Sequence, residues 1–199
     1  MPTTPGSSAP APPDGPLIVQ SDRTVLLEAA HPAADDARRA IAPFAELERA
    51  PEHIHTYRIT PLALWNARAA GLDAETVVHV LVTYSRFPVP HALLTEIAET
   101  MGRYGRLQLV ADPAHGLVLH AADRPVLEEV MRSKRTAGML GERLGDTDVV
   151  IHPSERGRLK QALIKLGWPA EDLAGYIDGE AHPIALAEDP AAAAAGAPG

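Results

Sequence analysis

Apolar segments in the first sixty residues predict short β-strands around one helical stretch. The segments LIVQ and RTVLLE flank a polar turn within Leu17–Glu28, so two short strands are expected there. Ile54–Ile59 has the composition of a further strand. Residues 33–50 are helical in composition, and Pro43 is expected to kink or split this helix because proline cannot continue a helical hydrogen-bond ladder.

Three segments then carry apolar residues at helical spacing, with start or stop signals at their ends. Thr60 is a candidate N-cap with Pro61 at the first helical position, and Gly71 is placed to end that helix. Asp73 is expected to cap the next helix. The third helix follows the prolines of the FPVP segment and carries Leu93, Leu94, Ile97 and Met101.

A β-hairpin is predicted after these helices, from Arg106–Val110 and Gly116–Ala121. Three helices followed by a hairpin is the element order of a winged helix. We therefore expect residues 17–122 to form a strand–helix unit plus a winged-helix-like domain. The third helix exposes Glu96 and Glu99, which would repel phosphate in a major groove, so docking onto protein suits this unit better than reading DNA.

A small α+β domain is predicted at residues 123–186. The sequence shows no internal repeat that would relate it to the first unit. Its helix Pro125–Arg135 precedes a Gly-containing stretch, and Asp148–His152 reads as a buried strand. The segment ERGRLKQALIKL then predicts a basic amphipathic helix that ends at Gly167. A short helix from Trp168 to Tyr176 is expected to close the domain. The fold class predicted for the whole chain is α+β.

Composition predicts two tails and excludes several chemistries. Residues 1–16 contain six prolines and residues 187–199 are rich in alanine, so both are expected to be disordered. The absence of cysteine excludes disulfides, thiolate zinc sites, Fe–S clusters and cysteine nucleophiles. No apolar run approaches the roughly 20 residues of a membrane span, and no secretory signal is recognised, so we expect a cytoplasmic protein, with nucleoid association open and no membrane partner.

Positive charge is concentrated in one part of an acidic chain. The formal net charge is −8, yet residues 103–165 contain 11 basic and 8 acidic side chains, whereas residues 166–199 contain no basic and 6 acidic ones. If the two basic helices adjoin, their cations would neutralise DNA phosphates without sequence preference. The alternative is an ordinary solvated helix surface. The candidate DNA-binding residues are Arg132, Lys134, Arg135, Arg156, Arg158, Lys160 and Lys165, with Arg103 and Arg106 as secondary candidates.

Motifs of catalysis and metal binding are missing from the sequence. It contains no G-x-x-x-x-G-K-[ST], G-x-G-x-x-G, G-x-S-x-G or H-E-x-x-H segment. The tetrad from Gly179 to His182 echoes a DEAH box but lacks its leading aspartate. His53 and His55 share one strand face beside Glu52, without a third ligand at diagnostic spacing. We therefore expect no catalytic residue, no metal and no cofactor.

Four long segments resemble a known family: GPLIVQSDRTVLLE, RRAIAPFAELERAPEHIHTYRITPLALWNARAAG, ALLTEIAETMGRYGRLQLV and VVIHPSERGRLKQALIKLGWPAEDLAGYIDGEAHPI. They closely resemble the N-terminal region of bacterial, actinobacterial-type XPB DNA repair helicases, over about Gly15 to Leu186. The resemblance implies an ATP-dependent 3′–5′ DNA translocase of nucleotide-excision repair. It further implies that this region is an accessory, non-motor part, followed in the family by a damage-recognition-like domain that helps to hold DNA.

The sequence departs from the family where the motor is expected to begin. After Leu186 it continues as AEDPAAAAAGAPG, without Walker A or DEAH motifs, so ATP hydrolysis is assigned to no residue. A short paralogue, a truncated gene and a separately encoded motor all stay open.

Two functional hypotheses follow from the sequence. The first is a non-catalytic module that binds DNA backbone weakly; the second docks on a helicase motor, nuclease or transcription-repair partner without touching DNA. A sequence-specific winged-helix regulator is a third, disfavoured by its carboxylates.

Overall fold

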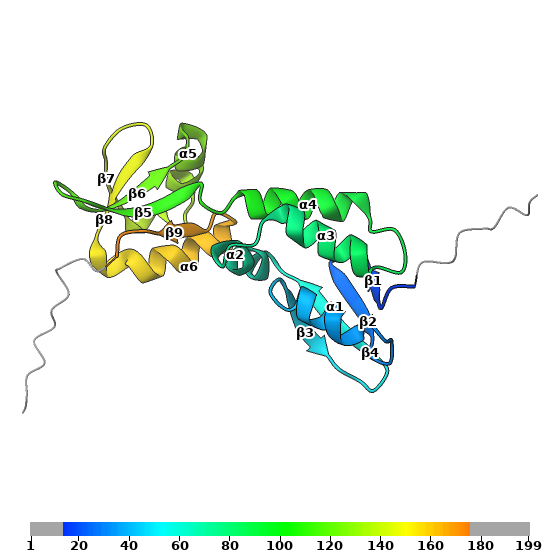
Figure 1. The fold of residues 1–199 in the computed structure, drawn as a ribbon. Helices are drawn as coiled ribbons and strands as arrows, with labels where there is room; N and C mark the ends of the chain where they lie inside the picture. The colour runs from blue at the N-terminus through cyan, green and yellow to red at the C-terminus, as the bar shows by residue number, and fades with distance from the viewer. Residues whose placement is uncertain (1–13, 176–199) are drawn as a thin grey trace, which may run out of the picture.

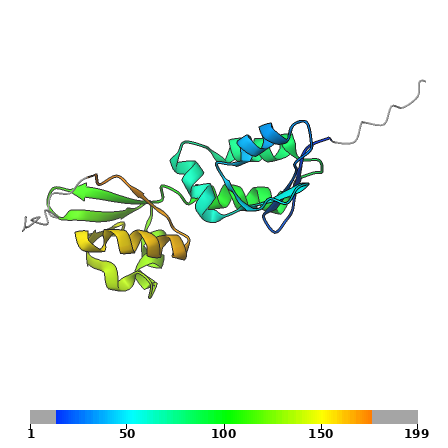
Figure 2. The ribbon, with the colours of Figure 1, turned by 90° about the horizontal axis from the view of Figure 1, so that it is seen from below.

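The computed structural model describes residues 14–175, which fold into two lobes joined by the segment after α4 (Figure 1). The same two lobes remain distinct when the molecule is turned by 90° (Figure 2). We call residues 14–102 the first lobe and residues 103–175 the second lobe. Residues 1–13 of the predicted N-terminal tail, the whole predicted C-terminal tail, the tetrad at Gly179 and the predicted helix end at Tyr176 lie outside the described residues. The sequence predicts disorder for residues 14–16 as well, but these residues are ordered in the first lobe: the carbonyl of Pro16 accepts a hydrogen bond from the backbone N–H of Glu28 at 2.9 Å.

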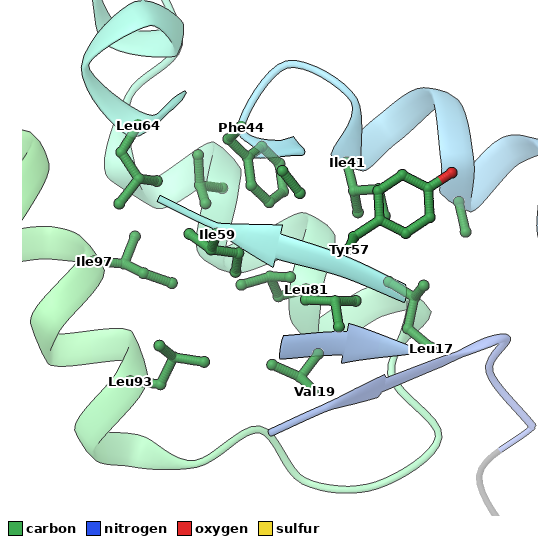
Figure 3. Close-up of a cluster of buried hydrophobic side chains, with 14 of the residues drawn as sticks. Leu17, Val19, Ile41, Phe44, Tyr57, Ile59, Leu64, Leu81, Leu93 and Ile97 are labelled. Carbon is green, nitrogen blue, oxygen red and sulfur yellow. The ribbon is translucent and has the colours of Figure 1, made fainter. Parts of the chain in front are cut away.

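The first lobe packs helices against a four-stranded antiparallel sheet of order β1-β2-β4-β3. Val25 of β2 is the register partner of Tyr57 of β4, so Val25 and Leu27 share the buried face of the sheet with Tyr57 and Ile59. Tyr57 and Ile59 are seen in this core in Figure 3. The elements in order are β1 Leu17–Val19, β2 Thr24–Glu28, α1 Ala34–Ile41, β3 Ala45–Arg49, β4 Ile54–Ile59, α2 Pro61–Ala69, α3 Ala74–Tyr84 and α4 His91–Gly102.

Local capping signals set the helix boundaries as the sequence predicts. The Thr60 side chain accepts a hydrogen bond from the backbone N–H of Ala63 at 3.1 Å, with Pro61 as the first residue of α2. Asp73 accepts one from Thr76 at 2.8 Å at the start of α3. These bonds satisfy backbone donors that the first helical turn leaves without a partner.

The predicted helix over residues 33–50 is wrong in its second half. Helix α1 ends at Ile41, two residues before Pro43, and the chain then forms β3. Ala45 of β3 pairs with Ile59 of β4. The ELER segment has a composition that favours a helix. Pairing with β4 gives its backbone hydrogen-bond partners in the sheet, so this tertiary contact overrides the local helical preference.

The second lobe contains a five-stranded sheet of order β7-β8-β6-β5-β9, in which only the β5–β9 pair is parallel. Helices α5 and α6 contribute to its core, with Leu127, Leu159 and Leu163 all fully buried. The elements in order are β5 Leu107–Asp112, β6 Gly116–Ala121, α5 Arg124–Arg132, η1 Ala137–Met139, β7 Leu140–Arg143, β8 Asp148–Ile151, η2 Pro153–Glu155, α6 Arg156–Leu166 and β9 Ala170–Asp172.

The winged-helix grouping is not confirmed, although the α+β fold class is. The predicted hairpin exists as β5–β6, but β6 pairs with β8 and β5 with β9. Leu109 and Leu119 are consequently buried in the core of the second lobe. The two cores thus separate between Met101 and Leu107, earlier than the domain boundary expected after residue 122.

The predicted helix from Trp168 to Tyr176 is also wrong, because its described part contains the strand β9. Leu107, Gln108 and Leu109 of β5 pair in register with residues 170–172. Pro169 lies just before this strand and suits an extended start. The pairing partner lies more than 60 residues earlier in the chain, so no local pattern could reveal it.

Candidate nucleic-acid interface

A groove in the second lobe gathers three of the predicted cations. Its volume is about 460 Å³. Arg158 and Lys165 are seven residues apart on α6 and therefore share one helix face. The groove is lined by Arg135, Met139, Gly157, Arg158, Gln161, Ala162 and Lys165. We call it the cationic groove.

Arg135 reaches the groove because α5 ends earlier than predicted. The helix stops at Arg132, and Ser133 adopts an extended backbone. The fully buried Thr136 then donates its hydroxyl hydrogen to the carbonyl of Val130, which fixes the following turn against the helix end. Lys134 and Arg135 consequently lie in this turn and not on the helix.

The electrostatics of the groove favour an anion. No carboxylate lines it. Within residues 14–175, Lys134, Arg135 and Lys165 are exposed and take part in no ion pair. Arg158 is held at 2.8 Å from Glu155, but its side chain remains 70% exposed. The structure thus leaves most of the positive charge at this groove uncompensated.

Arg132 lies beside a neighbouring hollow that also contains carboxylates. Its Nη2 is 3.8 Å from Glu128 Oε2, and its side chain is 82% exposed. Glu128 is shared, because Arg143 donates to it at 2.8 Å. That hydrogen bond, together with the charges of Arg143, Arg124 and Arg132, outweighs the effect of burial and holds the pKa of Glu128 below its ordinary value.

Arg156 and Lys160 are on a different face of α6 and bind Asp172 of β9. Arg156 donates to both Asp172 carboxylate oxygens, at 3.0 and 2.6 Å, and Lys160 donates at 3.0 Å. Arg156 also donates to the carbonyl of Gly175 at 2.8 Å. Both cations therefore connect α6 to the edge strand, and the structure does not bring them together with the cationic groove.

Arg103 and Arg106 also make contacts within the protein. The Arg103 guanidinium lies 5.0 Å from the centre of the Trp168 ring and donates to the carbonyl of Gly167 at 3.2 Å, which connects the end of α4 to the end of α6. Gly167 has φ +92°, and an added Cβ would lie 3.0 Å from Arg103. Arg106 pairs with Asp123, the N-cap of α5.

Sequence reasoning missed Asp172, Trp168 and Glu128. No sequence signal marks Asp172 as the partner of Arg156, since the two lie 16 residues apart in different elements. A signal for Glu128 did exist, because it precedes Arg132 by one helical turn.

The histidine pair does not form a metal site among the described residues. His53 is exposed and its Nε2 is 4.0 Å from Glu52. No cluster of three metal-ligating His, Asp or Glu side chains exists in residues 14–175. In that same part of the chain, no helix has the length and apolar character required to cross a bilayer.

Asp172 gives the second lobe a predicted pH dependence. Burial alone would raise the pKa of this carboxyl, but hydrogen bonds from Arg156 and Lys160 outweigh it and hold the pKa below its ordinary 3.8. The contribution of Asp172 to the free energy of unfolding is therefore complete above the unfolded-state pKa and is lost as pH falls through the lower folded-state pKa. Between about pH 6 and about pH 3, we expect the urea midpoint to fall further in the wild type than in Asp172→Asn. Trp168 fluorescence, with both proteins in a Trp65→Phe background, measures both curves, and equal falls would contradict the assignment.

Comparison with known proteins indicates which proteins this chain is similar to. Residues 17–145 match a protein family described as "Helicase conserved C-terminal domain". The chain is 72% identical over 176 residues to the DNA 3'-5' helicase XPB of Mycobacterium tuberculosis and 70% identical over 176 residues to that of Kineococcus radiotolerans. Both alignments cover 88% of this chain and 32% of the relative.

A eukaryotic relative is more distant. The chain is 27% identical over 156 residues to the general transcription and DNA repair factor IIH helicase/translocase subunit XPB/SSL2 of Saccharomyces cerevisiae, covering 78% of this chain and 18% of that protein. The chain thus spans about a third of the length of the bacterial relatives and less of the yeast one.

Proposed function

We propose that the chain, which belongs to the family described as "Helicase conserved C-terminal domain" over residues 17–145 and is similar to bacterial XPB helicases, is a non-catalytic accessory part of an XPB-type helicase that binds DNA backbone. One observation carries the proposal: Arg135, Arg158 and Lys165 come from two separate segments and line one groove without a carboxylate. Lys134 and the exposed Arg132 extend this positive surface. Phosphate is the anion that DNA presents along its length.

The chemistry of the groove favours backbone contacts over base recognition. Its lining contains no aromatic side chain on which a base could stack. The surface of the groove is largely apolar and includes Met139 and Ala162, while the long cationic side chains can reach phosphates at variable positions. Such contacts position DNA and carry no sequence information, so binding is expected to be independent of sequence.

The charge balance makes this binding weak and salt-sensitive. The second lobe has 11 basic and 10 acidic residues, and the whole chain has a net charge of −8. Attraction is therefore local to the groove, and salt screens it readily. Weak DNA binding is suited to an accessory region that positions DNA for a helicase motor. The expected partners are DNA and a helicase motor, in repair or transcription-linked processing.

The proposal is tested by fluorescence anisotropy of labelled single-stranded, duplex and bubble DNA across a salt series. Changing Arg135→Ala with Lys165→Ala should weaken binding to all duplex sequences alike. The slope of log affinity against log salt should decrease by about 2, since each lost phosphate contact contributes about 0.9. Circular dichroism checks that the variant remains folded.

Arg38→Ala with Arg39→Ala is the matched control. It also removes two cations, but from α1 of the first lobe, where Asp35 and Asp36 pair with them. This control should leave the salt slope unchanged. Absence of wild-type binding at low salt would overturn the proposal, as would an equal loss in the control.

A further inference from the structure

Helix α3 packs one apolar face into the first core and carries two further valines on its outer side, among polar residues. Val77 and Leu81 are fully buried in the first core. Val78 and Val82, one helical turn apart, lie on the other face, and Val82 is 54% exposed. Phe87, shortly after the helix ends, is 55% exposed. Val78 and Val82 therefore form a narrow apolar stripe among polar side chains of the same helix.

The outer side of α3 borders an open groove with acidic residues at one end. Its volume is about 460 Å³, and its lining runs from residue 73 to residue 82, about 14 Å at the helical rise. It is lined by Asp73, Glu75, Thr76, Val78, His79 and Val82. We call it the α3 groove.

Charge complementarity identifies the partner as basic. Within residues 14–175, neither Asp73 nor Glu75 takes part in an ion pair, and Glu75 is exposed. Asp73 uses one oxygen to cap the helix, and hydrogen bonds from Thr76 hold its pKa below the ordinary value. The first lobe has 12 acidic and 7 basic residues, which adds to the negative field.

We infer that the α3 groove binds a basic amphipathic helix of a protein partner. Two apolar side chains of that helix, three or four residues apart, would pack on Val78 and Val82, while a Lys or Arg would pair with Glu75. A second copy of this chain fits poorly, because the groove lining contains no Lys or Arg that could pair with Asp73 and Glu75 of the other copy. DNA fits poorly as well, since phosphates would meet Asp73 and Glu75. The inference is independent of DNA binding at the cationic groove.

A pair of model peptides tests the inference. The probes are two fluorescein-labelled 18-residue amphipathic peptides, each with leucine at i, i+3 and i+4 positions and with either lysine or glutamate elsewhere. The wild type should bind the lysine peptide and not the glutamate peptide. Val82→Arg should weaken binding of the lysine peptide at least about tenfold, because it adds bulk and like charge to the apolar floor. Ile54→Arg, at an exposed apolar position of β4, is its control.

A charge reversal makes the test specific for the acidic end. Glu75→Arg should weaken binding of the lysine peptide several-fold and permit binding of the glutamate peptide. Glu99→Arg changes the net charge equally at an exposed site on α4 and should do neither. Failure of both peptides to bind, or equal losses in the control variants, would overturn the inference. So would wild-type dimerisation that Val82→Arg abolishes, or loss of DNA binding in Val82→Arg.

Discussion

Replacing Phe44 by alanine is expected to lower the free energy of unfolding of the first lobe by about 3–5 kcal/mol. Phe44 is fully buried in the turn between α1 and β3 and lies in the first core with Ile41 and Leu64 (Figure 3). Removing the ring forfeits its transfer from water and leaves a cavity that rigid neighbours fill only in part. The effect is large because this one side chain holds together segments that differ in secondary structure.

The two tryptophans allow this loss to be assigned to one lobe. Trp65 belongs to α2 of the first lobe, where its Nε1 donates to the carbonyl of Thr100 at 2.8 Å, and Trp168 belongs to the second lobe. Urea unfolding of Phe44→Ala in a Trp168→Phe background, followed by Trp65 fluorescence, measures the change. Leu47→Ala on β3, where Leu47 is exposed, should cost no more than about 0.5 kcal/mol. A loss of similar size in both variants would show that burial of Phe44 is not the cause.

Changing Asp172→Asn is expected to weaken the second lobe and strengthen DNA binding. The side chain of Asp172 is 17% exposed and pairs with both Arg156 and Lys160. Losing its charge leaves two cations without full compensation, which should cost about 2 kcal/mol, below the range for fully buried pairs because both cations are partly exposed. The variant also removes one negative charge near α6 and leaves Lys160 without its carboxylate partner, so that Lys160 can contact phosphate.

DNA binding of this variant distinguishes a structural role of the two cations from a direct one. The sequence alone predicts that Arg156→Ala with Lys160→Ala flattens the salt slope by about 2. From the structure we expect that double variant to lower stability and to change the slope little, whereas Asp172→Asn should steepen it. Asp146→Asn removes the same charge from a 74% exposed side chain and is the control. An unchanged affinity and slope in Asp172→Asn would contradict the prediction.

The resemblance to bacterial XPB helicases is confirmed by identities of 70–72% over 176 residues. The family description mentions a C-terminal helicase domain, whereas the resemblance implied an N-terminal, non-motor region. The described residues form two α+β lobes, and the sequence contains no G-x-x-x-x-G-K-[ST] segment. The accessory role therefore rests on the groove and its cations and not on the name of the family.

The sequence by itself determined those features whose cause is local. The caps at Thr60 and Asp73 act within three residues, and the end of α6 at Gly167 needs a left-handed backbone that glycine adopts without strain. The hairpin β5–β6 joins strands separated by three residues. The α+β class follows from such elements.

Only the tertiary structure decided how distant segments pair. The ELER segment becomes β3 because it pairs with β4, and β9 forms because it pairs with β5. The β5–β6 hairpin belongs to the second sheet because its leucines pack against the apolar sides of α5 and α6. The same holds for the cations, whose individual positions are evident in the sequence. Which of them remain available to a phosphate depends on where carboxylates such as Asp172 come to lie, because an ion pair requires proximity in space and the sequence fixes only proximity along the chain.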